Sequence, residues 1–143
     1  MSALQTDVRL ADAVPCDVAV ERSYWQSCRE HAMRLQECDD CGNFRFYPGY
    51  VCDRCGSSDM TWKPVSGRGR VHTCTVVHRP AVGFTRAPYV WALIELDEGP
   101  VMASNVVGCP VDDVRIGMAV EVVYDDVTPE WTVPRFRPAE EGA

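Results

Sequence analysis

Short valine-rich segments separated by turn residues dominate the second half of the chain. Apolar and polar positions alternate only in part within them, as at Val71, His72 and Thr73. No helical pattern long enough for a parallel crossover separates the segments, which favours antiparallel pairing. The pattern therefore predicts five strands, over about 69–78, 89–96, 101–107, 118–124 and 131–136.

Five strands in about 75 residues favour a small barrel, and we expect a partly open five-stranded OB barrel. Gly67 and Gly69 would loosen the start of its long first strand. An SH3-like barrel would explain the same strand count. The pattern is lost after Pro134, so we expect the C-terminal tail to fray.

An amphipathic pattern precedes this β-rich half. Val20, Tyr24, Cys28 and His31 recur at helical spacing and form one apolar stripe. The stripe predicts a helix from Asp17, its N-cap, to about His31. We expect the stripe to cover this protein's own barrel or ribbon, with a partner protein as the alternative.

Composition and charge narrow the class of protein. At 143 residues the chain is one domain, or a compact domain with a small appendage. No apolar run approaches the ~20 residues that a bilayer span needs, and residues 1–14 lack the apolar core of a secretion signal, so we expect a cytoplasmic protein. The net charge of -7 disfavours attraction to nucleic acid or anionic lipid over the whole surface.

Four of the eight cysteines carry the strongest chemical signal. Cys38, Cys41, Cys52 and Cys55 form C-x2-C-x10-C-x2-C, with a glycine after each pair and aromatic residues between the pairs. Two residues between cysteines let one tight turn aim both thiolates at a single ion. The pattern predicts a rubredoxin-like zinc ribbon that binds Zn²⁺, although iron would use the same ligands. Four cysteine ligands leave no open coordination position, so the metal should be structural.

The remaining cysteines do not indicate a nucleophile. Cys28 with His31, and Cys74 with His72, could each be drawn as a thiolate and its base. A buried cysteine is usually a small hydrophobic residue, and strand residues two apart share a face without reliable contact. We therefore expect no catalytic residue in this chain.

A basic window interrupts the acidic sequence. No Asp or Glu lies between Asp59 and Glu95, so the window has a local charge of +5. Such a segment suits a ligand with phosphates and an acyl chain, or an acidic partner protein, because Arg pairs with phosphate and with carboxylate. The alternative is that these arginines have no binding role and lie on a solvated outer face of the barrel. The candidate ligand- or partner-binding residues are Arg68, Arg70, Arg79, Phe84 and Arg86.

The chain thus divides into three segments. Residues 1–34 hold an N-terminal arm and the helix, residues 35–64 the zinc ribbon, and residues 65–143 the barrel with its tail. The predicted fold class is mainly β.

The order of these motifs resembles a known family. The sequence is similar to the zinc-ribbon plus OB-fold family catalogued as domain of unknown function 35. The similarity lies in the order of four motifs: a helix, the two cysteine knuckles around an aromatic hairpin, V-x-T-C-T-V-V-H at 71–78 and P-Y-V-W-A-L-I-E-L-D-E-G at 88–99. The resemblance runs from about residue 17 to 136. The four cysteines carry over as metal ligands.

The resemblance implies an accessory role. Members of that family look like non-catalytic subunits of acyl-CoA enzymes with a thiolase-like fold: thiolases, hydroxymethylglutaryl-CoA synthases and lipid-transfer-protein-like aldolases that shorten steroid side chains. We therefore expect a subunit of a hetero-oligomer that helps to form the acyl-CoA channel of its thiolase-fold partner.

Two other classes of function remain open at this point. OB barrels bind nucleic acid by stacking bases on aromatic side chains, although the acidic charge of this chain opposes that role. A small electron carrier with iron in the four-cysteine site is the other alternative.

Overall fold

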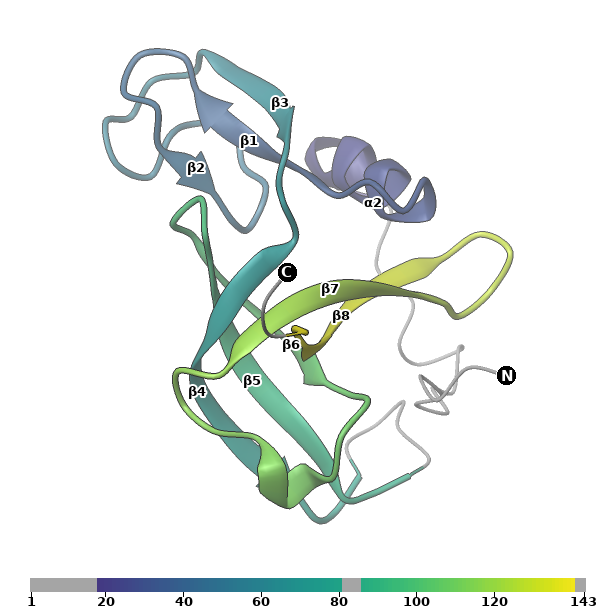
Figure 1. The fold of residues 1–143 in the computed structure, drawn as a ribbon. Helices are drawn as coiled ribbons and strands as arrows, with labels where there is room; N and C mark the ends of the chain where they lie inside the picture. Colours follow the sequence, from purple (N-terminus) through teal and green to yellow (C-terminus); the bar gives the residue numbers. More distant parts are fainter. Residues whose placement is uncertain (1–17, 81–85, 141–143) are drawn as a thin grey trace.

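The computed structural model describes residues 18–80 and 86–140 (Figure 1). A ribbon-like sheet and a short helix lie at one end of a β-barrel. The elements in chain order are η1 (Ala19–Glu21), α2 (Arg22–Arg29), β1 (Arg34–Cys38), β2 (Phe44–Arg45), β3 (Met60–Pro64), β4 (Arg68–Val77), β5 (Tyr89–Leu96), β6 (Val101–Val106), η2 (Val111–Asp113), β7 (Ala119–Asp126) and β8 (Thr132–Pro138).

The five predicted strands form a closed barrel in the order β4-β5-β6-β8-β7. All neighbours are antiparallel except β6 and β8, which run parallel where Val106 meets Phe136. This is the OB arrangement, so the predicted fold is confirmed, and the barrel is closed where a partly open one was expected. Side chains inside the barrel come from every strand. They include Val71, Val90, Ile94, Met102, Val120 and Phe136.

The barrel closes at the start of β4. Gly69 and Arg70 pair with β5 on one side and with β7 on the other. A Cβ at Gly69 would overlap the carbonyl oxygen of Glu95 and lie 3.0 Å from Ile94 Cγ2. Only glycine lets the three strands approach this closely.

The ribbon is a three-stranded antiparallel sheet in the order β2-β1-β3. Gln36 in the central strand fixes the loop that follows β2. Its Nε2 donates to Gly49 O at 2.9 Å, and its Oε1 accepts from Gly49 N at 2.9 Å. The Gln36 side chain thus satisfies both backbone hydrogen-bonding groups of Gly49, as a neighbouring strand would.

Helix α2 is shorter than predicted. It ends at Arg29, because His31 adopts a left-handed conformation with φ of 56°. The amide of Ala32 donates to Ser27 O at 3.0 Å and that of His31 to Cys28 O at 2.9 Å, which is the hydrogen-bond pattern of a Schellman motif. The predicted N-cap Asp17 lies outside the described residues.

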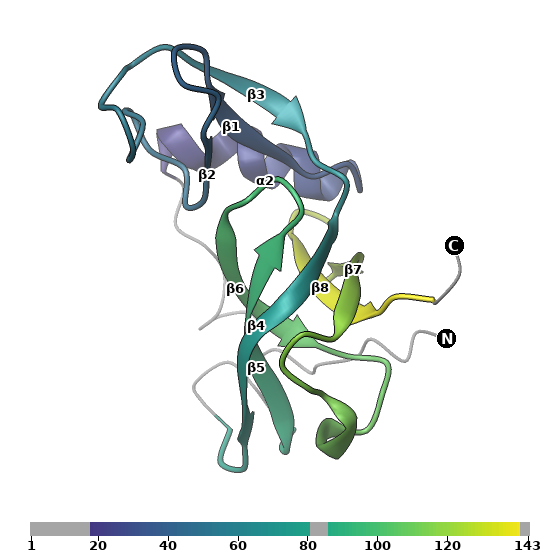
Figure 2. The ribbon, with the colours of Figure 1, turned by 60° about the vertical axis from the view of Figure 1, so that its left-hand side comes forward.

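Helix α2 lies between the ribbon and the barrel (Figures 1 and 2). Tyr24 and Cys28 are buried in the same core cluster as the barrel interior. The middle of the apolar stripe therefore covers this protein's own core, whereas His31 is exposed beyond the end of the helix. The amide of Met33 donates to the hydroxyl oxygen of Tyr124 in β7 at 2.8 Å and ties the segment after the helix to the barrel.

The last strand extends beyond the residue where the sequence pattern is lost. β8 continues to Pro138, and Arg135 and Phe136 are both buried. Neighbouring residues of a strand point to opposite faces. Both side chains are buried because the barrel interior covers one face of β8 and other residues cover the opposite face. Among the described residues, no helix has the length and apolar character needed to cross a membrane.

Candidate metal centre and its surroundings

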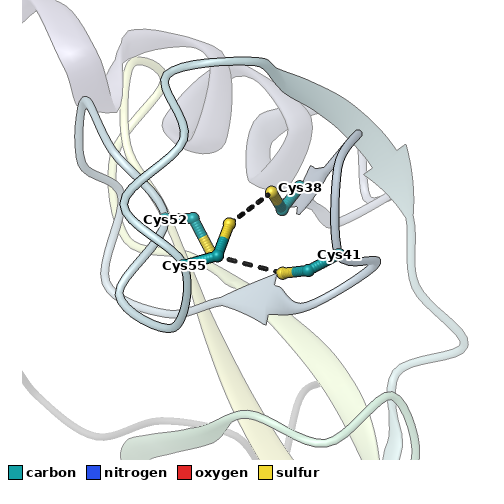
Figure 3. A group of neighbouring side chains, drawn as sticks. All are labelled: Cys38, Cys41, Cys52 and Cys55. Atoms are coloured by element: carbon teal, nitrogen blue, oxygen red, sulfur yellow. Dashed lines mark hydrogen bonds between the residues drawn. The ribbon is translucent and has the colours of Figure 1, made fainter.

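The four predicted cysteine ligands converge at the tip of the ribbon (Figure 3). Their Sγ atoms all lie within 4.8 Å of one another. The sulfurs of Cys38 and Cys55 are 3.5 Å apart, and those of Cys41 and Cys52 are 3.6 Å apart. The four side chains face a common point, as the ligands of a single ion must.

Two matching turns create this convergence. The amide of Gly42 donates to Cys38 O at 2.8 Å, and the amide of Gly56 donates to Cys52 O at 2.9 Å. Both glycines have positive φ, 75° and 78°, which side chains rarely tolerate. The glycine after each cysteine pair is therefore required by the turn that aims the thiolates.

Backbone amides favour negative charge at the site. Amides of Cys55 and Arg54 lower the pKa of Cys52 to about 6, and the Arg54 amide lies 3.3 Å from its sulfur. The amide of Ser57 also favours the thiolate of Cys55, but hydrogen bonds with neighbouring cysteine sulfurs raise the pKa of Cys55 to about 12. Four thiolates that backbone amides stabilise are a donor set that fits a soft divalent ion.

The structure does not gather the basic candidates into one patch. Arg68 and Arg70 are exposed on β4, but Glu121 is the cross-strand partner of Arg68, and Glu95 is that of Arg70. Residues directly opposite each other on paired strands have neighbouring side chains. Strands β5 and β7 therefore place carboxylates beside the basic residues of β4, although the carboxylate of Glu121 accepts a hydrogen bond from Arg137 Nε at 2.9 Å.

The other basic candidates lie at the far end of β4. Arg79 and Arg86 are exposed on either side of a segment that includes Phe84. Phe84 lies outside the described residues. Arg79 is eleven residues beyond Arg68, roughly 36 Å along an extended chain, so the two ends of the basic window are separate surfaces.

The described cysteines outside the ribbon form no catalytic arrangement with a base. Cys28 is buried inside the helix face, and burial raises the pKa of its thiol to about 12, whereas His31 is exposed beyond the end of the helix. His72 is exposed, with Nδ1 3.8 Å from Glu95 Oε2, and Cys74 is partly buried. Neither of the two pairs considered from the sequence brings a cysteine thiolate beside a histidine base.

The sequence analysis missed a cleft where the helix, the ribbon and the barrel meet. We call this the junction cleft; its volume is about 520 Å³. A single buried arginine, Arg135 of β8, forms part of its wall. Nothing in the sequence marks Arg135, because it follows Pro134 in a segment that resembles a frayed tail. The wall also includes Trp25, Tyr47, Tyr89, Trp91 and Asn105.

Comparisons with known proteins agree with this architecture. Residues 25–61 match the model described as ChsH2, rubredoxin-like zinc ribbon domain, and residues 62–125 match ChsH2, C-terminal OB-fold domain. The fold and the cysteine site thus define a zinc-ribbon and OB-barrel protein.

Individual relatives narrow the class. A "DUF35 domain-containing scaffold protein" of Methanocaldococcus jannaschii is 36% identical over 110 residues, 76% of this chain and 78% of the relative. A "Probable enoyl-CoA hydratase alpha subunit" of Thermomonospora curvata is 36% identical over 120 residues, 83% of this chain. This chain spans only 38% of the length of that second relative.

A solved structure matches over nearly its whole length. A chain of the "Ltp2-ChsH2(DUF35) aldolase" superposes with a TM-score of 0.80 at 34% identity, covering 88% of this chain and 99% of that one. The chain belongs to the DUF35 family of zinc-ribbon and OB-fold proteins.

Proposed function

We propose that this chain is a non-catalytic accessory subunit that binds a thiolase-fold enzyme, such as a thiolase or a lipid-transfer-protein-like aldolase. In this complex it helps to form the acyl-CoA channel. Steroid or lipid side-chain degradation in the cytoplasm is the proposed setting. The observation that carries the proposal is the match over 99% of the DUF35 chain of an aldolase.

We further propose that Cys38, Cys41, Cys52 and Cys55 hold one Zn²⁺ as a structural ion. The ion would join the two cysteine turns and fix the ribbon, without an open position for substrate or water. Metal analysis of the purified chain, together with its visible spectrum, tests the identity. Iron held by four thiolates absorbs visible light, so a coloured protein with stoichiometric iron would overturn the assignment to zinc.

Co-purification tests the accessory role. The tagged chain is co-expressed with each thiolase-fold protein of its own genome, and the eluate is analysed by mass spectrometry and native mass. We expect one such protein to elute in fixed ratio and its acyl-CoA activity to rise when this chain is present. A partner enzyme with full activity in the absence of this chain would contradict the proposal.

Arg79, Arg86 and Phe84 are the proposed contacts to the acyl-CoA or to the partner near its channel. Arg79→Glu should weaken complex formation or raise the KM for the acyl-CoA, because it reverses an exposed charge beside the proposed contact surface. Lys63→Glu is the matched control, since it reverses an exposed charge on the ribbon strand β3. Equal effects of both variants would show that only total charge matters.

Nucleic-acid binding is the less favoured function. The net charge of -7 and the carboxylates opposite Arg68 and Arg70 oppose a phosphate-binding surface. Retention of single-stranded DNA or RNA at low salt would revive this alternative.

A further inference from the structure

A row of outward-facing side chains crosses the barrel beneath the junction cleft. Trp91 of β5 is the cross-strand partner of Asn105 of β6. Asn105 in turn lies beside Arg135 of β8, since β6 and β8 pair where Val106 meets Phe136. The row therefore leads from an exposed indole, 46% exposed, to a guanidinium that is only 3% exposed.

Two neighbours hold the guanidinium of Arg135 in place. Its Nε donates to Asp125 Oδ2 at 2.8 Å, and its Nη1 donates to Asn105 Oδ1 at 2.5 Å. Asn105 is itself fixed, because its Nδ2 donates to Val90 O at 2.9 Å. The arginine is therefore pre-organised before any ligand arrives.

One nitrogen of Arg135 remains for a ligand. The hydrogen bonds of Arg135 to described residues involve Nε and Nη1 only. No fully buried side-chain nitrogen or oxygen of the described residues lacks a partner, so Nη2 must reach accessible space. Arg135 forms part of the wall of the junction cleft, so its Nη2 is placed to face that cleft.

The charge of this donor is already compensated. Asp125 forms an ion pair with Arg135 at 2.8 Å, and Arg135 is the single charged residue among the described residues that line the cleft. An anion would lose its hydration and gain little net attraction from a neutralised pair. An uncharged oxygen acceptor loses less on desolvation and still receives a strong hydrogen bond.

The rest of the wall is apolar and aromatic. Trp25, Tyr47, Tyr89 and Trp91 surround the space, and Tyr47 and Trp91 are 42% and 46% exposed. A volume of about 520 Å³ lies within the ~300–1,000 Å³ typical of small-molecule sites. Aromatic walls with one fixed polar group are typical of sites that orient a flat ring compound.

We propose that the junction cleft binds an uncharged ring compound that carries a carbonyl oxygen, with that oxygen accepting a hydrogen bond from Arg135 Nη2. The site lies on this chain alone and involves none of the cysteine ligands. It goes beyond the accessory role and does not depend on the thiolase-fold partner. The two proposals can therefore fail separately.

Ligand binding to the ¹⁵N-labelled, metal-loaded full chain tests the proposal. The probes are acetophenone, ethylbenzene and benzoate, which share a ring and differ in one group: a neutral acceptor, no acceptor or an anion. Side-chain indole signals of the four tryptophans report where each probe binds. We expect acetophenone to shift the signals of Trp25 and Trp91 while Trp62, which does not line the cleft, stays unchanged. We expect about tenfold tighter binding than for ethylbenzene.

Variants assign the contacts. Trp91→Ala should weaken acetophenone binding roughly fivefold, because it removes one aromatic wall. Ile116→Ala is the matched control, since Ile116 is a 71% exposed hydrophobic residue that does not line the cleft. Arg135→Lys should abolish the preference for the ketone over the hydrocarbon. If Arg135→Lys does not fold, the proposal is tested by the relative affinities of the three probes for the parent chain and by the effect of Trp91→Ala.

Several results would overturn the proposal. Unchanged Trp25 and Trp91 signals with all probes would show that the cleft takes no small ring compound. Tighter binding of benzoate than of acetophenone would show an anion site. Equal binding of acetophenone and ethylbenzene would show that Arg135 contributes no hydrogen bond.

Discussion

An alanine at Gly69 should open the barrel where its first strand meets both neighbours. The new Cβ would overlap Glu95 O and lie 3.0 Å from Ile94 Cγ2 and 3.1 Å from Glu95 C, where ordinary contact begins at 3.4 Å. The obstacle is mainly backbone, which cannot rotate away. Strands β4 and β5 must therefore separate by at least about 0.4 Å, and by more at the carbonyl oxygen.

The structure sets the size of the effect. Such a shift stretches the nearby hydrogen bond from Asp97 N to Arg68 O, now 2.9 Å, toward the limit of about 3.5 Å. Overpacking costs ~1–3 kcal/mol and a weakened hydrogen bond ~1 kcal/mol, so Gly69→Ala should lower the free energy of unfolding by about 3 kcal/mol. For a chain of this length the melting temperature should fall by about 10 °C.

Urea unfolding of the metal-loaded chain, followed by tryptophan fluorescence, measures this change. Thr75→Ala is the control, because it places alanine at an exposed position of the same strand and should lower stability by no more than about 1 kcal/mol. A Gly69→Ala protein as stable as Thr75→Ala would refute the reasoning that the close approach at Gly69 is required for barrel closure.

Three further predictions concern individual side chains. Cys52→Ser should abolish stoichiometric zinc binding and lower the melting temperature, as measured by metal analysis and calorimetry, because one of four ligands is lost. The hydrogen bond from His31 lowers the pKa of Asp126, so the stabilisation is present above about pH 4 and is lost as pH falls through the folded pKa. Since Asp126 is exposed, the effect is a few tenths of a kcal/mol, and Asp126→Asn should remove that part of the acid dependence of unfolding. Cys28, with a pKa of about 12, should resist iodoacetamide at pH 8 in the folded chain and react after unfolding, as mass spectrometry of the alkylated peptides would report.

The metal centre and the strands could be predicted because their signals are local. A cysteine pair and its glycine specify one turn, and a valine-rich segment between turn residues specifies one strand. The spacing of Cys38 and Cys41 therefore contained most of the geometry that the structure shows at that position.

Features that depend on strand pairing could not be predicted in this way. The basic window appeared uncompensated because Glu121 is 53 positions from Arg68 in the sequence, and only the β4–β7 register brings them together. The role of Arg135 could not be predicted for the same reason, since its hydrogen-bond partners Asp125 and Asn105 lie on other strands. The helix ended early because His31 accepts a left-handed backbone while its ring stacks on Tyr124 at 5.0 Å.

The shared core around α2 has a consequence for how the molecule can unfold and evolve. Tyr24, Cys28, Met33 and Leu35 pack into the same cluster as the barrel interior, so neither module has a complete hydrophobic interior of its own. Cooperative unfolding should therefore span both modules, and metal bound at the ribbon tip stabilises the barrel by mass action. A recombination event that exchanges either module must therefore carry the helix with it. The helix keeps the ribbon and the barrel together, and the linker between β3 and β4 does not do so alone.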